Sequence, residues 1–369
     1  MSASHRFDYG RQLDDFVAGE TYLHPFEVTV DESIVGPYMS SFIDATPLWS
    51  SDRAAHALGL GRRPVPPHLL LNLGLSFSVH DTSQQAIAHL AYVRVDFPKP
   101  LEIGGTIRGA SRVVETKPSS SGDKGVVHVH TVLVDDDGHR VLDFERKALI
   151  RGGSLGSRPA VPGGVSTGDE WLGALPSRPF TARLREVPPG RALFRPPLFG
   201  CFEDFEPGAV FAHANGRTVG DSERMRLSAI CRNSHPLHWD NVYCQTESFK
   251  KDRVVYGGLV LAWTLTQSSI DLGGHVLWEE RWSDGAHPAP ILAGDTIFAA
   301  TQVLAVRPLS DHVGAVDLRV VGVKNARPEA LIAAGADLFT AERDKAREAR
   351  TPEKVVEITR SVLVRRRGA

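Results

Sequence analysis

The sequence is poor in cysteine, has no excess of charge of one sign and contains no long apolar run. Its three cysteines among 369 residues match no metal-binding spacing, which argues against a disulfide framework and predicts no metal site. Lys and Arg number 42 against 44 Asp and Glu, so charge gives no reason to expect nucleic acid or a membrane as a partner. No stretch reaches the roughly 18 apolar residues of a membrane span, and the N-terminus has no apolar leader segment. We therefore expect a cytoplasmic protein.

What the sequence does contain is one internal repeat. Short motifs recur after a nearly constant interval of about 190 residues. The matching positions are Asp15 and Asp204, Thr29 and Thr218, Asp44 and Asn233, and Gly104 and Gly294. An interval kept over about ninety residues is hard to obtain by chance and predicts a duplicated unit of about 150 residues.

The repeat divides the chain into three predicted parts. We expect an N-terminal copy over residues 1–155, a linker over 156–195 whose first half is rich in Gly, Ser and Pro, and a C-terminal copy over 196–369. Arg146 matches Arg360 at a larger interval than the other pairs. The C-terminal copy should therefore carry an insertion of about 25 residues, which we place in the polar stretch 329–354.

Both copies have the same predicted order of elements. A short helix with a Pro-Leu-Trp or Pro-Leu-His tripeptide precedes a strongly apolar helix, near Leu69–Val79 in the first copy and Leu259–Leu272 in the second. Runs with the period-two alternation of half-buried strands follow, such as Thr106–Val114 and Gly125–Val134. A helix that is apolar almost all round, followed by antiparallel strands, predicts an α+β fold in which a curved sheet wraps a central helix.

The C-terminal copy carries the motifs best suited to chemistry. Asn233–His238 reads Asn-Ser-His-Pro-Leu-His, and Tyr256–Gly258 opens the apolar helix. The pair resembles the MaoC-like, R-specific enoyl-CoA hydratases, hotdog proteins with an Asp-x-Asn-Pro-x-His segment and a Gly-containing turn into the long helix. Within that family the resemblance is greatest to the tandem mesaconyl-CoA hydratases (β-methylmalyl-CoA dehydratases), which share the first-position Asn and an entry like Ala289–Thr296 into the next strand. The resemblance covers nearly the whole chain and implies a tandem hotdog fold.

The same resemblance implies a hydro-lyase that adds water reversibly to a 2-enoyl-CoA thioester, such as mesaconyl-CoA or a related branched or dicarboxylic acyl-CoA. His238 is suited to proton transfer, and Asn233 would orient the water. Backbone N–H groups of Gly257 and Gly258, at the predicted start of a helix, would stabilise the thioester oxyanion. Asn233 stands where the broader family has Asp, so His238 would carry most of the proton transfer. No cofactor is expected beyond the CoA of the substrate.

Further side chains are candidates for the substrate or CoA groove. Tyr256, His287 and Asp240 lie near the motifs in sequence, although His287 could be an exposed loop histidine and Asp240 a helix cap. A dicarboxylic acyl group would also need a cation for its free carboxylate. The sequence does not select among the nearby arginines, which are Arg226, Arg232 and Arg253.

The N-terminal copy is expected to lack a working site. Trp49 stands where the other copy has His238, and Pro67-His68-Leu69 replaces the Tyr-Gly-Gly helix start. A second active site built on His68 or His80 remains an alternative. Alternative functions are a hotdog thioesterase that uses Asp271 or Gln267 on the long helix, and a non-catalytic acyl-CoA-binding protein. The two copies should pair within one chain, with a further homodimer left open.

Overall fold

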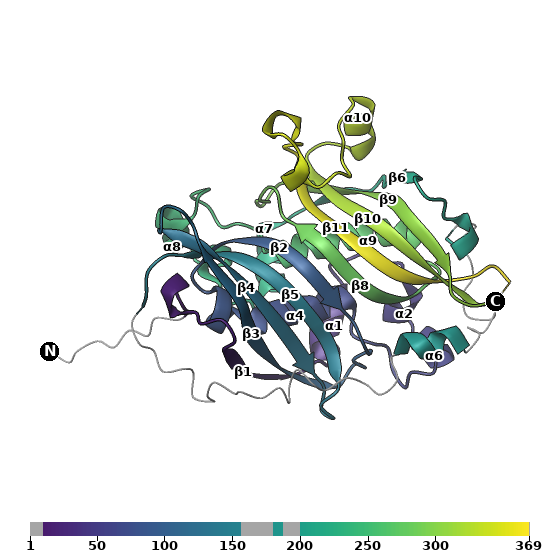
Figure 1. Cartoon of the computed structure of the whole chain (residues 1–369). Helices are drawn as coiled ribbons and strands as arrows, with labels where there is room; N and C mark the ends of the chain where they lie inside the picture. The colour runs from purple at the N-terminus through teal and green to yellow at the C-terminus, as the bar shows by residue number, and fades with distance from the viewer. Residues whose placement is uncertain (1–9, 156–179, 187–199, 369) are drawn as a thin grey trace.

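The computed structural model describes residues 10–155, 180–186 and 200–368. The predicted order of elements is present in both copies (Figure 1). The N-terminal copy consists of β1 (Thr21–Thr29), α1 (Glu32–Met39), α2 (Pro47–Ser50), α3 (Asp52–Ala57), α4 (Pro67–Phe77), β2 (Ala86–Asp96), β3 (Thr106–Pro118), β4 (Lys124–Val134) and β5 (Arg140–Arg151). A short π-helical segment, η2 (Val79–Ser83), follows α4 closely.

The C-terminal copy repeats this plan with an altered first strand and an insertion. Its elements are β6 (Val210–Ala212), β7 (Arg217–Thr218), α7 (Asp221–Ile230), the 3₁₀ helix η4 (Pro236–His238), α8 (Asn241–Glu247), α9 (Gly257–Leu272), β8 (Val276–Ala286), β9 (Thr296–Pro308), β10 (Val313–Lys324), α10 (Pro328–Ala333) and β11 (Lys354–Arg365). Here two short strands, β6 and β7, take the place of β1 and both pair with β9.

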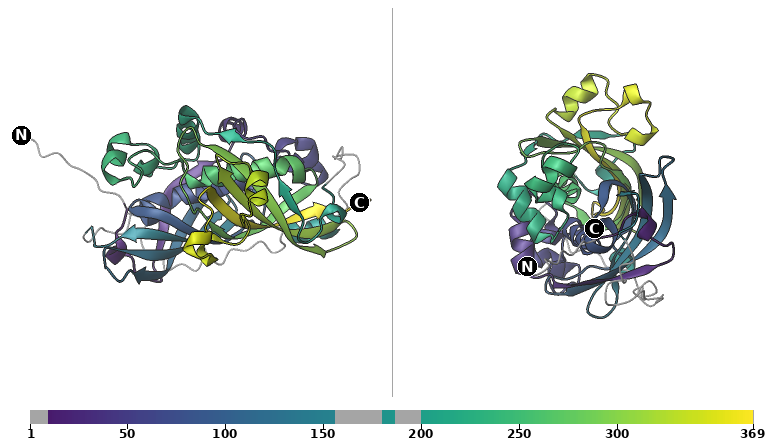
Figure 2. Two further views of the ribbon diagram at one scale, coloured as in Figure 1. Left: turned by 90° about the horizontal axis from the view of Figure 1, so that it is seen from above. Right: turned by 90° about the vertical axis from the view of Figure 1, so that its left-hand side faces the viewer.

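The strands form one antiparallel sheet that runs through both copies. Its order is β1-β3-β4-β5-β2-β8-β11-β10-β9-β6, with β7 beside β9. The copies meet where β2 pairs with β8, in a register that sets Tyr92 opposite Gly285 and Asp96 opposite Arg281. Viewed along the molecule, the sheet curves around the central helices (Figure 2). The prediction of an α+β tandem hotdog is confirmed.

The two apolar helices fill the concave side of the sheet. All residues of α4 are buried, as are most of α9, and the two helices lie against each other in one continuous core. Asn72 of α4 donates a hydrogen bond from Nδ2 to the carbonyl of Gly258 at 3.2 Å. Because each helix is apolar almost all round, it can pack at once against its own strands and the other helix. No helix in the described part of the chain could span a membrane.

Most of the predicted linker, 156–195, lies outside the described residues, and within it only α6 (Phe180–Glu186) is described. Phe180 packs edge-on against Trp278 of β8, with ring centroids 5.1 Å apart. Arg183 donates to the carbonyl of Gly59 at 3.1 Å. This helix therefore contacts both copies.

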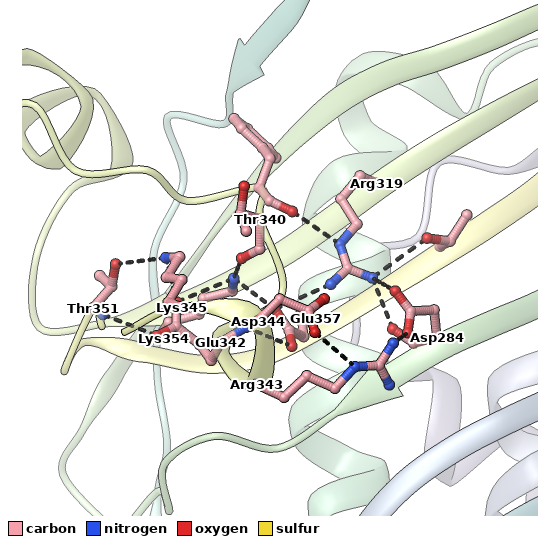
Figure 3. Close-up of polar contacts among 12 residues, drawn as sticks. Asp284, Arg319, Thr340, Glu342, Arg343, Asp344, Lys345, Thr351, Lys354 and Glu357 are labelled. Atoms are coloured by element: carbon pink, nitrogen blue, oxygen red, sulfur yellow. Dashed lines mark hydrogen bonds and ion pairs between the residues drawn. The ribbon is translucent and has the colours of Figure 1, made fainter. Parts of the chain in front are cut away.

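The predicted insertion lies between β10 and β11 and contains α10 and two short 3₁₀ turns. A buried ion network anchors its base to the sheet (Figure 3). Lys354 binds Glu357 at 2.5 Å and Glu342 at 3.3 Å, and Arg319 binds Glu357 at 3.1 Å. Every charge in this group has an opposite charge beside it, which is the condition under which ions can be buried.

Candidate functional site

One cavity of about 320 Å³ is lined by residues of both copies. The C-terminal copy contributes the histidine motif, the start of α9 and the segment after β8. The N-terminal copy contributes the end of α4, η2 and parts of β2 and β5. The lining residues used below are Ser83, Ala88, His89, Tyr92, Arg146, Asn233, His235, His238, Tyr256, Gly257, Gly258 and His287.

His238 ends η4 and is held in a defined tautomer. Its Nδ1 lies 2.8 Å from the carbonyl oxygen of Val254. A carbonyl can only accept a hydrogen bond, so Nδ1 carries the proton and Nε2 is left with a lone pair. Burial lowers the pKa of His238 to about 4, although the Val254 carbonyl acts in the opposite direction. The imidazole is therefore neutral at pH 7 and can take up a proton.

Asn233 is buried beside this motif, and its side chain is fixed by the backbone. Its Oδ1 accepts the backbone N–H of His235 at 2.9 Å, and its own carbonyl accepts the indole N–H of Trp239 at 2.5 Å. One lone pair of Oδ1 and both Nδ2 hydrogens remain for a ligand or a water. Asn233 and His238 thus line the same cavity with complementary hydrogen-bonding groups.

The third predicted group, the start of α9, also opens into the cavity. The helix begins at Gly257, so the N–H groups of Gly257 and Gly258 have no partner within the helix. Both glycines lie close to the side chain of a neighbouring element. A Cβ on Gly257 would lie 3.0 Å from Nε2 of His287, and a Cβ on Gly258 would lie 1.7 Å from Oδ1 of Asn72. At Gly258, the missing side chain thus serves the close packing of the two central helices.

The other groove candidates lie in different places. Tyr256 and His287 line the cavity, and the Tyr256 ring centroid lies 5.3 Å from that of His238. His287 is therefore not an exposed loop histidine, and burial lowers its pKa to about 4. Asp240 is exposed and accepts the N–H of Tyr243 as the N-cap of α8, which is the helix-cap alternative, and it is not in the described lining of the cavity.

Comparison with known proteins places the chain in a family. A family model described as mesaconyl-CoA hydratase matches residues 3–332. The chain belongs to this family. It is 30% identical over 322 residues to a mesaconyl-CoA hydratase of Cereibacter sphaeroides, covering 86% of this chain and 90% of the relative. It is 28% identical over 318 residues to a beta-methylmalyl-CoA dehydratase of Chloroflexus aurantiacus, covering 86% and 89%.

Solved structures show the same fold over almost the full length. A MaoC domain protein dehydratase from Chloroflexus aurantiacus superposes with a TM-score of 0.80 at 26% identity, covering 99% of this chain and 100% of the other. A Mycobacterium tuberculosis protein described as a double hotdog superposes with a TM-score of 0.72 at 21% identity, covering 95% and 98%. The second likeness bears on the fold alone.

In this member of the mesaconyl-CoA hydratase family, aromatic rings fill the position in the repeat that is equivalent to the cavity beside His238. Trp49 is buried and packs edge-on against Trp278, with ring centroids 5.7 Å apart. Trp278 matches Ala88 at the interval of the repeat, and Ala88 lines the cavity of the working side. His68 is bound by Asp44 at 3.4 Å and by the Tyr38 hydroxyl at 3.0 Å, so its ring is tied into the core.

Several residues weighed from sequence lie outside the described lining of the cavity. Gln267 donates to the carbonyl of Ile297, and Asp271, near the far end of α9, pairs with His213. Among the nearby arginines, Arg226 donates to Ser41 and Arg253 pairs with Asp221, while Arg232 is exposed. None of these side chains is in the described lining of the cavity beside His238.

Three lining residues were not selected from sequence. His235 is buried in the lining, and His89 and Arg146 come from the N-terminal copy. Burial lowers the pKa of His235 to about 3 and holds that of His89 well below its ordinary value. A site shared between two copies brings together residues that are far apart in the chain, which a motif search within one copy does not find.

Proposed function

We propose that the cavity is the active site of a hydro-lyase that adds water reversibly to a 2-enoyl-CoA thioester. Mesaconyl-CoA, with β-methylmalyl-CoA as its hydrated partner, or a related branched or dicarboxylic acyl-CoA is the proposed substrate. The main support is one geometric fact. A neutral imidazole with a free Nε2 lines the same cavity as a glycine-rich helix N-terminus. The family membership agrees with this proposal.

In the proposed hydration, Nε2 of His238 takes a proton from a water that Asn233 orients. The water oxygen forms a bond to the β-carbon while the π electrons of the double bond move toward the thioester oxygen. The N–H groups of Gly257 and Gly258, at the positive end of the α9 dipole, stabilise that oxygen. The imidazolium then returns the proton to the α-carbon. One water is added in total, and His238 regains its starting state.

The reaction involves no net oxidation or reduction, so we propose that it needs no cofactor besides the CoA of the substrate. The cavity volume suits an acyl group and the adjoining thioester, while the nucleotide of CoA would remain outside. Tyr256 and His287 would form part of its wall. A cytoplasmic location and a further homodimer stay predictions.

The thioesterase alternative is not favoured. Its two candidate groups on α9, Gln267 and Asp271, bind other parts of the protein and lie outside the described lining. The two activities also differ in their products, since hydration keeps the thioester intact and hydrolysis frees the CoA thiol.

The test is to incubate the protein with mesaconyl-CoA and with crotonyl-CoA. Loss of the enoyl-thioester absorbance is followed together with release of free thiol. We expect the absorbance to fall without thiol release. Thiol release in step with substrate loss would support the thioesterase, and binding without turnover would support the non-catalytic alternative.

A further inference from the structure

A single charged side chain lines the described part of the cavity, and it comes from the N-terminal copy. Arg146 of β5 is only 5% exposed, and the lining as described contains no Asp, Glu or Lys. The histidines of the lining are neutral because burial keeps each pKa well below 7. A guanidinium remains protonated in proteins, so Arg146 gives the cavity one fixed positive charge.

No carboxylate in the described part of the chain neutralises this charge. Three hydroxyl oxygens share the two N–H groups of Arg146 Nη2, those of Ser78 at 2.7 Å, Thr82 at 2.9 Å and Ser83 at 3.1 Å. Its Nε is buried and has no hydrogen-bond acceptor among the described residues. Hydroxyl groups hold the guanidinium in place but leave its charge unbalanced. Burying an unbalanced charge lowers the free energy of unfolding by roughly several kcal/mol.

The other copy shows how the same position is balanced when no ligand is involved. Arg360 is the counterpart of Arg146, and the two occupy matching registers, opposite Trp282 and Tyr92 respectively. Arg360 is paired with Glu279, through Nη2 and also through Nε at 3.3 Å. Arg360 is not among the cavity-lining residues.

The counterpart of Glu279 in the N-terminal copy, at the interval of the repeat, is His89. Both ring nitrogens of His89 are buried and have no hydrogen-bond partner among the described residues. Burial, and to a smaller extent the guanidinium of Arg146, holds its pKa well below the ordinary value. A neutral histidine cannot balance a guanidinium. Thus the arginine that faces the cavity lacks its anion, whereas the arginine outside the cavity has one.

We propose that Arg146 binds a second carboxylate on the acyl group of the substrate, remote from the thioester. This inference rests on the proposed hydration at the same site and adds a specificity determinant to it. The bound carboxylate balances the charge of Arg146, as Glu279 balances the charge of Arg360. The enzyme consequently prefers enoyl-CoA substrates with a carboxylate-bearing acyl group over neutral ones of similar size.

The test compares kcat/KM for mesaconyl-CoA with kcat/KM for crotonyl-CoA in the full-length protein. Arg146→Met should lower the ratio of the two values by about 30-fold, which corresponds to about 2 kcal/mol of lost charge-assisted hydrogen bonding. His89→Glu should lower the ratio to a similar extent, because it supplies Arg146 with the carboxylate that Arg360 has. His89→Gln and Arg253→Met are the matched controls, whose ratios should stay within about threefold of wild type.

The second variant keeps the test decisive if Arg146→Met does not fold. A ratio within about threefold of wild type in either folded variant overturns the role of Arg146. Failure of the proposed function has a different signature. It would be shown by absence of hydration of both substrates by the wild type, or by full activity in His238→Ala. Crotonyl-CoA hydration that depends on His238, with an unchanged ratio in Arg146→Met and His89→Glu, contradicts the role of Arg146 alone.

Discussion

The pH dependence of hydration provides a detailed test of His238 as the base. Burial lowers its pKa to about 4, and the base is active only in its neutral form. At pH 5.5 an imidazole with a pKa of about 4 is about 3% protonated, whereas one near 6.5 is about 90% protonated. We therefore expect kcat/KM to be nearly constant from about pH 5 to 8.

The assay is initial-rate hydration of crotonyl-CoA over this pH range, because its acyl group carries no second titrating carboxylate. Circular dichroism at each pH checks that the fold persists, since the buried histidines take up protons at a higher pH in the unfolded state and acid therefore favours unfolding. The acidic limb of kcat/KM should lie well below pH 5.5. A limb centred near pH 6.5, with the fold intact, would show that the base is a solvent-exposed histidine or that burial does not shift His238.

Two further predictions concern stability. Gly258→Ala should lower the free energy of unfolding by about 2 kcal/mol because its Cβ meets the side-chain oxygen of Asn72, and the loss should be much smaller in an Asn72→Ala background. Urea denaturation of the four proteins measures this coupling, and equal losses in the two backgrounds would contradict the proposed contact. Glu279→Gln should lower the free energy of unfolding by about 3 kcal/mol because Arg360 is left buried without its anion. An unchanged denaturation midpoint in that variant would mean that the pair is not formed.

The repeat made much of the fold predictable. The fixed interval between matching motifs, together with one apolar helix in each copy, predicted both α4 and α9 and the strands that follow them. The start of α9 at Gly257 was predicted because Tyr-Gly-Gly immediately precedes the apolar run. The insertion was predicted from the change of interval, but its anchoring by Lys354 and Glu342 depends on side-chain contacts that a pattern does not contain.

One physical reason explains why some residues of the site could not be selected from the sequence. Arg146 and His89 belong to the copy without the catalytic motif, and only the pairing of β2 with β8 and of α4 with α9 brings them to His238. Arg226, Arg232 and Arg253 are close to the motif in sequence, yet none of them is in the described lining of the cavity. A signal did exist in the repeat, because Arg146 matches Arg360 while His89 replaces Glu279. Comparing the charges of the two copies position by position would have revealed the unbalanced arginine.

The most direct test of the account is the rate of mesaconyl-CoA hydration by His238→Ala, measured beside wild type on protein shown to be folded. Removal of the general base should lower kcat/KM by at least about 100-fold, with the fold unchanged. Hydration at a rate within about threefold of wild type would contradict the assignment of proton transfer to this imidazole.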